Sequence, residues 1–300
     1  METDIILQTH NLKKYFGQVH AVDGVSISVL RGQVYGFLGP NGSGKTTTIG
    51  MILGLLHPTA GSISIFGDPV TPSQNKPLRR VGALVGAPTL VPFLSARQNL
   101  ELLARFNPGL PSERVNEILE IVGLYEAADR RAGQFSSGMK QRLGLGMAVL
   151  HKPELLILDE PTNGMDPAGM REIRNLITSL SGQGVTVFLS SHLLHEIEQI
   201  CDQVAVLKQG RIIAEGEVKD LLGKMETVRV RVPSTTEAAC CLRKLPAAKD
   251  VKPNGTYLMI SGVSSQEVVA HLTANGIIPS EVSTGGPDLE SIFLELTESN

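Results

Sequence analysis

Hydrophobic residues recur along the chain with two different periods, and the period changes several times before residue 223. Short apolar or alternating runs predict strands, at residues 5–7, 25–29, 34–38, 61–67, 81–85, 155–159 and 185–189. Apolar residues at helical spacing predict helices, at residues 46–56, 95–106, 112–122, 136–150, 167–181 and 193–201. Strands that alternate with helices are typical of an α/β domain, and the three consecutive helices predict an inserted helical subdomain at about residues 92–150.

The pattern changes after Gly223. Residues 227–232 alternate sharply between apolar and polar, as expected of an antiparallel strand with one buried face. Strands and helices then follow in β-α-β-β-α-β order, which is the order of a ferredoxin-like fold, and a further helix is predicted at 289–296. We therefore predict two domains, at residues 1–223 and 224–300.

Composition narrows the classes of partner. The chain of 300 residues has a formal net charge of −3, four tyrosines and no tryptophan. It lacks the basic stripe with stacking aromatics that nucleic-acid binders show, so we expect no nucleic-acid partner. Two of its three cysteines are adjacent, at Cys240 and Cys241, which fits neither a disulfide framework nor a metal site and predicts reduced thiols in a cytosolic protein. No apolar run reaches membrane-spanning length, so a membrane role requires a separate partner.

One stretch carries a specific chemical prediction. Residues 39–46 read G-x-x-x-x-G-K-T, between an apolar strand at 34–38 and a predicted helix. Glycines let successive N–H groups converge on an anion, and the helix N-terminus adds its positive dipole end. Lys45 can reach the β- and γ-phosphates of a nucleotide, and the Thr46 hydroxyl can bind Mg²⁺.

Two acidic residues stand at the end of the apolar strand at 155–159, one as its last residue and one directly after it. Asp159 comes last in that strand, where α/β sheets bind ligands, and fits a carboxylate that serves Mg²⁺. Glu160 follows and can orient or deprotonate a water molecule. His192 follows another core strand at the same predicted edge of the sheet and is a candidate for contact with a γ-phosphate.

Two other positions allow more than one interpretation. Tyr15 is a lone aromatic in a polar stretch that we interpret as a turn; it fits surface packing and stacking on adenine equally, until the phosphate loop downstream favours stacking. Ser136, Ser137 and Gly138 open a helix, where serine and glycine make a good cap and the same free N–H groups make an anion site.

Five stretches stand in one order: the phosphate loop, residues 136–138, residues 159–160, residues 163–166 and His192. With these motifs the chain resembles the nucleotide-binding subunit of an ABC transporter, and the drug-export subfamily typified by bacitracin- and daunorubicin-resistance exporters in particular. The resemblance covers roughly residues 5–222, and residues 288–294 resemble that subfamily's C-terminal extension.

The resemblance implies a P-loop ABC-type ATPase core with an antiparallel β subdomain. It also implies a head-to-tail homodimer that binds ATP and Mg²⁺, with no further metal, and drives a membrane subunit. Glu160 would polarise the attacking water, His192 would sense the γ-phosphate, and Thr46 and Asp159 would serve Mg²⁺. The other implied ATP contacts are Tyr15 at the adenine, Gly39, Pro40, Asn41, Gly42, Ser43, Gly44, Lys45, Thr46 and Thr47 in the loop, and Ser136, Ser137, Gly138, Met139 and Asp166 across the dimer interface.

Two positions depart from the family pattern. The signature segment, usually L-S-G-G-Q, is Phe135-Ser136-Ser137-Gly138-Met139, which keeps the serine cap and one glycine. The family also has a glutamine after the strand at 81–85, touching Mg²⁺ and the coupling surface, and here that position is Gly86. The role of that residue is therefore open.

The resemblance predicts a location in the cytoplasm, on the inner face of the cell membrane through the membrane partner. The cargo would be a drug, an antibiotic or a lipid-like molecule, and export is the favoured direction. The alternative is a soluble ABC-type ATPase with a regulatory role unrelated to transport. A GTPase would need an N-K-x-D motif, whereas Asn75-Lys76 is followed by Pro77-Leu78.

Overall fold

The computed structural model describes residues 4–71, 73–223, 227–248 and 250–285. The chain divides into two compact units, Met1–Glu215 and Gly216–Asn300. This division falls before the boundary at residue 223 that the sequence suggests, because α7 (Val218–Gly223) groups with the second unit. The helix predicted at 289–296 lies outside the described residues.

A six-stranded sheet forms the centre of the first unit, in the order β10-β9-β3-β8-β7-β6. Neighbouring strands from β9 to β6 run parallel, so their carboxyl ends meet at one edge of the sheet. β3 and β7 are buried along their whole length, which explains their uninterrupted apolar sequences. The strands are β3 (Val34–Leu38), β6 (Val81–Val85), β7 (Leu155–Asp159), β8 (Thr186–Ser191), β9 (Gln203–Lys208) and β10 (Arg211–Glu217).

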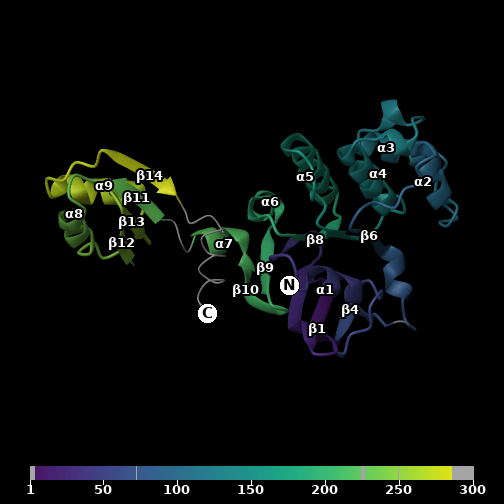
Figure 1. The fold of residues 1–300 in the computed structure, drawn as a ribbon, viewed down its shortest axis with the longest axis horizontal. Coiled ribbons are helices and arrows are strands. Elements are labelled where there is room, and N and C mark those ends of the chain that lie inside the picture. The colour runs from purple at the N-terminus through teal and green to yellow at the C-terminus, as the bar shows by residue number, and fades with distance from the viewer. Residues whose placement is uncertain (1–3, 72, 224–226, 249, 286–300) are drawn as a thin grey trace. The chain divides into compact units, whose positions relative to one another are not determined.

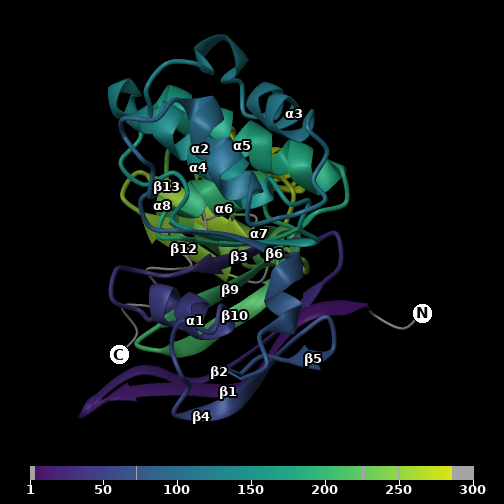
Figure 2. The same ribbon diagram turned by 90° about the vertical axis from the view of Figure 1, so that its right-hand side faces the viewer.

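A second sheet, antiparallel, has the order β2-β1-β4-β5. Its strands are β1 (Ile5–Phe16), β2 (Val19–Leu30), β4 (Ala60–Ile65) and β5 (Asp68–Pro69). Helix α1 (Lys45–Ile52) lies between this sheet and the central one, as Figure 2 shows, and one apolar cluster joins all three layers. α1 is therefore fixed from both sides, and so is the loop that precedes it.

Helices cover the other face of the central sheet (Figure 1). They are α2 (Ala96–Ala104), α3 (Arg114–Ile121), α4 (Ser137–Val149), α5 (Pro167–Gly182) and α6 (Leu194–Ile200), with short 3₁₀ turns at Lys76–Arg80, Tyr125–Ala127 and Ala132–Gln134. The first three of these helices form the helical subdomain that the sequence predicts. Within the described residues, no helix has the length and apolar character needed to cross a membrane.

The second unit is a four-stranded antiparallel sheet in the order β12-β13-β11-β14, which confirms the ferredoxin-like prediction. Its elements are β11 (Thr227–Arg231), α8 (Thr235–Leu242), β12 (Asp250–Asn254), β13 (Tyr257–Ser261), α9 (Ser265–Ala274) and β14 (Glu281–Gly285). Alternate apolar residues of the strands pack with α8 and α9 in a separate core. The unit therefore has the means to fold by itself.

Candidate active site

The phosphate loop joins β3 to α1 and depends on its glycines. Gly42 and Gly44 have φ angles of 80° and 108°, in the left-handed region that glycine adopts without strain. A side chain on Gly39 would meet the carbonyl oxygen of Leu207 at 2.5 Å, and one on Gly44 would meet that of Ala21 at 2.4 Å. Pro40, Asn41 and Gly42 form the exposed tip, and Thr47 is half-buried in α1.

Lys45 lies folded back over this loop and is only 5% exposed. Its Nζ donates to the carbonyl oxygens of Gly39 at 2.7 Å and Pro40 at 3.2 Å, and lies 3.0 Å from Glu160 Oε1. The buried hydroxyl of Ser43 has no hydrogen-bond partner in the structure. The loop thus holds an ammonium group and an unpaired hydroxyl donor, the kinds of group that an anion site uses.

Thr46 and Asp159 meet across the edge of the central sheet. Thr46 Oγ1 donates to Asp159 Oδ2 at 2.9 Å, and Ser190 Oγ donates to Asp159 Oδ1 at 2.6 Å. Asp159 and Ser190 are register partners on the parallel strands β7 and β8. This set of hydroxyl and carboxylate oxygens fits the hard-oxygen preference of Mg²⁺. Ser190 received no role of its own from the sequence, although it lies two residues before His192, which was predicted at this edge.

Glu160 lies between Lys45 and His192. Its φ of 50° is unusual for a residue with a side chain. Its backbone N–H donates to two oxygens of Ser190, to Oγ at 3.1 Å and to the carbonyl oxygen at 3.2 Å. His192 Nδ1 is 2.6 Å from Glu160 Oε2, within hydrogen-bond distance of the carboxylate. The two carboxylate oxygens therefore have different partners, one cationic and one imidazole.

Tyr15 lies in β1 and not in a turn, so that interpretation of the sequence was wrong. β1 continues through the polar residues to Phe16 because it pairs with β2 along its whole length, and Tyr15 faces His20 in the register. The two rings stack with centroids 4.0 Å apart. Tyr15 Oη donates to Asp23 Oδ1 at 2.8 Å.

Asp23 is held by three neighbours. Arg211 donates to its Oδ2, Tyr15 to its Oδ1, and the ammonium group of Lys13 lies 3.4 Å away. The hydrogen bond from Arg211, followed by that from Tyr15, lowers the pKa of Asp23 to about 2. The carboxylate is therefore ionised throughout the physiological range.

The residues predicted to act across a dimer interface cap helices in the single chain. Ser136 Oγ accepts from the N–H of Met139 at the start of α4, and Asp166 Oδ1 accepts from the N–H of Gly169 at the start of α5. Ser136, Ser137 and Asp166 are exposed. Figures 1 and 2 show α4 and α1 on opposite sides of the central sheet. The fold therefore does not bring the signature segment onto the phosphate loop of the same chain.

Gly86 follows β6, the strand next to β7. Its φ is 65°, and a side chain there would meet no atom within 4 Å. Val85 and Asp159 are register partners, so Gly86 lies beside the strand end that carries Asp159 and Glu160. Among the described residues, the first carbon of a side chain at this position would therefore find open space.

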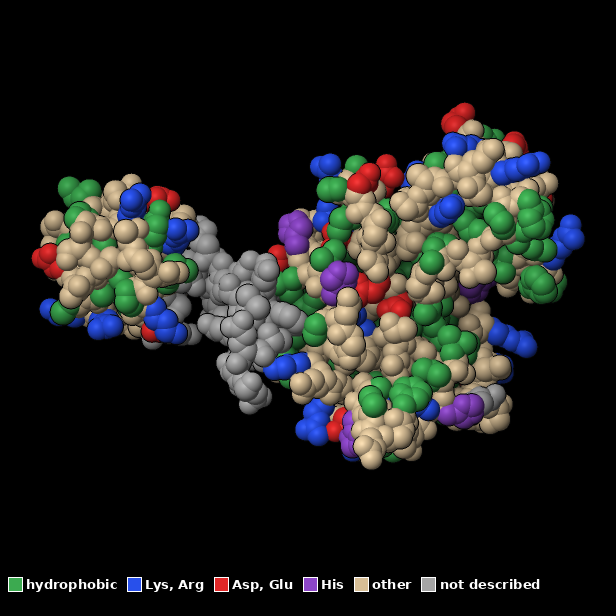
Figure 3. Space-filling model, in the orientation of Figure 1, with side chains coloured by type: hydrophobic (Ala, Val, Ile, Leu, Met, Phe, Trp, Pro, Cys, Tyr) green, Lys and Arg blue, Asp and Glu red, His purple; other side chains and the backbone are tan. Residues whose placement is uncertain are grey.

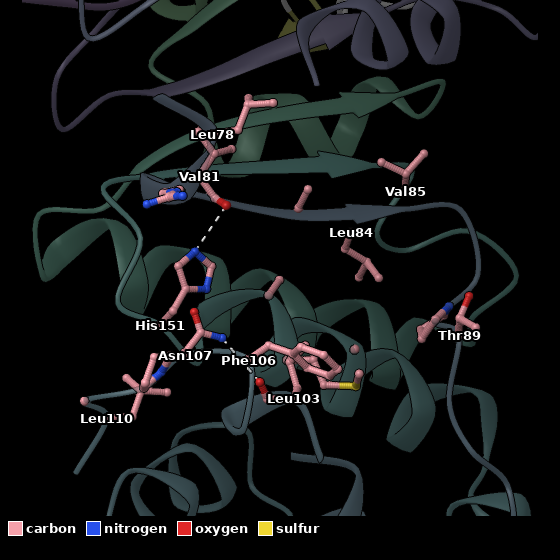
Figure 4. Close-up of a pocket in the computed structure, with 18 of the residues that line it drawn as sticks. Leu78, Val81, Leu84, Val85, Thr89, Leu103, Phe106, Asn107, Leu110 and His151 are labelled. Carbon is pink, nitrogen blue, oxygen red and sulfur yellow. Dashed lines mark hydrogen bonds between the residues drawn. The ribbon is translucent and has the colours of Figure 1, made fainter. Parts of the chain in front are cut away.

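A cavity of about 1080 Å³ lies between β6 and the helical subdomain (Figure 4). Apolar and polar residues of both sides line it, and His151 lies at one end with Nε2 3.2 Å from the carbonyl oxygen of Val81. Phe106 lines the cavity yet is 77% exposed. Hydrophobic side chains also gather on the neighbouring surface over α2 (Figure 3), where Leu102 is exposed.

Comparisons with known proteins show the family of the chain. Residues 22–163 match the ABC transporter family model. A bacitracin transport ATP-binding protein of Enterococcus faecalis is 40% identical, with 99% of this chain and 97% of that protein covered. A linearmycin resistance ATP-binding protein of Bacillus subtilis is 37% identical, with 97% and 98% covered.

Solved structures extend the comparison to the fold. An ATP-binding cassette of an ABC transporter in its ADP conformation has a TM-score of 0.65 and 32% identity, covering 73% of this chain and 94% of that chain. A dimeric ATP-binding cassette in a post-hydrolysis state, bound to ADP and Pi, has a TM-score of 0.64 and 25% identity, covering 71% of this chain and 99% of that chain.

Proposed function

The chain belongs to the ATP-binding proteins of ABC transporters, and from that premise we propose that a pair of these chains hydrolyses ATP to drive a membrane subunit that exports an antibiotic. The observation that carries the proposal is one connected cluster at the sheet edge. Lys45 contacts Glu160, Glu160 contacts His192, and Thr46, Asp159 and Ser190 lie alongside them.

The contacts of Glu160 support a role as the general base in hydrolysis. When the β- and γ-phosphate oxygens of ATP take the ammonium group of Lys45, Oε1 of Glu160 loses its ion pair. That oxygen can then accept a proton from the water that attacks the γ-phosphorus, while the bond from the γ-phosphorus to the bridging oxygen of ADP breaks. His192 keeps the other carboxylate oxygen in place through Nδ1.

The oxygen ligands for Mg²⁺ would come from Thr46 and Asp159, since their oxygens are already within 2.9 Å of each other. Ser190 orients Asp159 by donating to its other oxygen. When bound, Mg²⁺ neutralises charge on the phosphates.

The second copy of the chain would complete the site with Ser136, Ser137, Gly138, Met139 and Asp166. These residues are at helix starts whose N–H groups favour an anion, and α4 lies away from the phosphate loop of its own chain. A dimeric state is known for the related cassette bound to ADP and Pi, which supports the same arrangement here.

The membrane subunit would bind at the cavity between β6 and the helical subdomain. The apolar side chains in its mixed lining, together with the exposed ring of Phe106, suit a protein segment that carries apolar side chains, and Gly86 adjoins its wall at Val85. The chain would then be held at the inner face of the cell membrane. Two relatives that match nearly the whole chain are named for bacitracin transport and linearmycin resistance, which supports an antibiotic as cargo.

Affinity purification from detergent-solubilised membranes tests this proposal. We expect the wild-type chain to copurify with a membrane subunit, and cells that express both to tolerate more bacitracin or linearmycin. Glu160→Gln is the matched control, since the near-isosteric amide cannot take a proton; it should copurify equally but give no tolerance. An ATPase that is always recovered free of membrane protein would favour the regulatory alternative.

A further inference from the structure

We propose that the turn between β9 and β10 fixes the spacing between the Tyr15 ring and the phosphate loop, and that Arg211 is a positioning residue for the nucleotide base. This inference rests on the proposed function, because it takes Tyr15 as the surface on which the base stacks. The turn lies far along the sequence from the phosphate loop and from Tyr15, yet it contacts the loop directly and reaches Tyr15 through Asp23.

The backbone of one residue bridges the two parts of the site. Gly210 N–H donates to the carbonyl oxygen of Ser43 in the phosphate loop at 2.9 Å. The carbonyl oxygen of Gly210 accepts from the N–H of Asp23 on β2 at 2.8 Å. Gln209 and Gly210 have φ angles of 48° and 78°, as in a tight two-residue hairpin turn. The turn thus links β2, the strand that pairs with the one holding Tyr15, to the phosphate loop.

The side chain of the next residue, Arg211, connects the turn to the Tyr15 ring through Asp23. Arg211 donates to Asp23 Oδ2 from Nη2 at 2.6 Å and from Nε at 3.0 Å. Tyr15 Oη donates to the other oxygen, Oδ1, at 2.8 Å. With both oxygens engaged, the carboxylate cannot rotate freely, and its orientation fixes the hydroxyl end of the ring. His20 stacks against the same ring, so its tilt is restrained as well.

The exposed fractions of Arg211 and Asp23 indicate that their ion pair positions the ring and contributes little to the stability of the fold. Arg211 is 70% exposed while Asp23 is 12% exposed, so the ion pair lies at the surface, where such pairs add little to folding. Loss of Arg211 should therefore leave the unit folded but let the carboxylate and the ring move. A displaced ring weakens binding of the base without touching the groups that act on the γ-phosphate.

Steady-state ATPase assays on Arg211→Gln test the proposal. We expect KM for ATP to rise by about threefold to tenfold, with kcat within about twofold of wild type. Inhibition by inorganic tripolyphosphate, which has no base, should be unchanged. Arg243→Gln removes an exposed arginine of the second unit and should change nothing. An unchanged KM for ATP, or equally weakened tripolyphosphate inhibition, would overturn the proposal.

A double-mutant cycle shows whether Arg211 acts through Tyr15. Tyr15→Phe keeps the ring but removes the hydroxyl that Asp23 holds, so it should raise KM to a similar extent. The KM for ATP of the Tyr15→Phe, Arg211→Gln double variant should then be close to that of each single variant. Fully additive increases in KM would show that the guanidinium acts by another route. A wild-type chain that hydrolyses no ATP would instead contradict the proposed function itself.

A pair of glycine variants tests the backbone bridge. Gly210 and Gly67 have φ angles of 78° and 79°, but only a side chain on Gly210 would approach another segment, at 2.9 Å from the carbonyl oxygen of Ala21. Gly210→Ala should raise KM for ATP several-fold more than Gly67→Ala, which shares the backbone strain. Equal values of KM in the two folded variants would contradict a bridging role for the turn.

Discussion

The two units of the chain bury different kinds of side chain. In the first unit, buried positions include Lys45, Asp159, Ser190 and Glu196, together with other polar groups. In the second unit, every described side chain that is buried is apolar, from Val218 to Leu272. The second unit keeps its charges on the surface, where Arg229 lies 3.7 Å above the ring of Tyr257.

This difference distinguishes a unit that holds a reactive site from a unit whose described core is apolar throughout. Burying a charge destabilises a fold unless a partner compensates it, so an apolar core is the simpler solution. The first unit instead holds Lys45 against Glu160 and Asp159 against Thr46 and Ser190, at the one edge where parallel strands end. Polar groups buried at that edge mark chemistry, and the described core of the second unit contains none.

The largest effect is expected from Lys45→Ala. It removes the charge that would meet the β- and γ-phosphates and leaves Glu160 without its ion pair, so kcat should fall by about 10²–10³-fold or more. Steady-state ATPase assays on the purified chain measure this. Lys76→Ala, at an exposed position in a 3₁₀ turn, is the matched control and should keep wild-type activity. Near-normal turnover in Lys45→Ala would refute the assignment of the site.

Leu258→Ala should damage the second unit alone. Leu258 is fully buried in its apolar core, so the truncation should cost about 2–5 kcal/mol of that unit's stability. Hydrogen exchange of the β11 and β13 amides measures the loss, while ATPase activity should stay within about twofold. The neighbour Met259 is only half-buried, and Met259→Ala should cost well under half as much. A matching loss of hydrolysis in Leu258→Ala would show that the units are not independent.

Gly86→Gln tests whether the missing glutamine limits the chemistry of the first unit. The space is open, but the backbone is left-handed, so any side chain there brings strain. Gly86→Ala carries the same strain without the amide and is the reference. Without the membrane partner, the glutamine variant should turn over about 10-fold faster than the alanine variant, if one oriented contact stabilises the transition state by about 1.4 kcal/mol. Equal turnover would mean that the glutamine is not limiting.

The smallest effect on ATP hydrolysis is expected from truncation after Gly223. The shortened chain keeps β10 and α7 and removes the whole ferredoxin-like sheet. Its KM and kcat for ATP should lie within about twofold of the full chain, because no group of the candidate site is removed. A folded truncated protein that no longer binds ATP would contradict the separation of the two units.

The sequence by itself was sufficient for the parts of the site that are local. The phosphate loop is eight consecutive residues whose glycines determine the backbone, and Asp159 with Glu160 ends a strand that its apolar run identifies. The fold class followed from the alternation of strands and helices, and the ferredoxin-like order from the pattern after Gly223. In each case the residues that carry the signal are neighbours along the chain.

Only the tertiary structure revealed the hydrogen bonds that hold the side chains of the site in place. Ser190 orients Asp159 from 31 positions away, and Arg211 holds Asp23 from 188 positions away. Tyr15 was placed in a turn because its neighbours are polar, whereas pairing of β1 with β2 keeps it in a strand. Such contacts depend on which strands become neighbours in the folded sheets. Strand pairing depends on burial of the whole core, so a short stretch of sequence does not predict it.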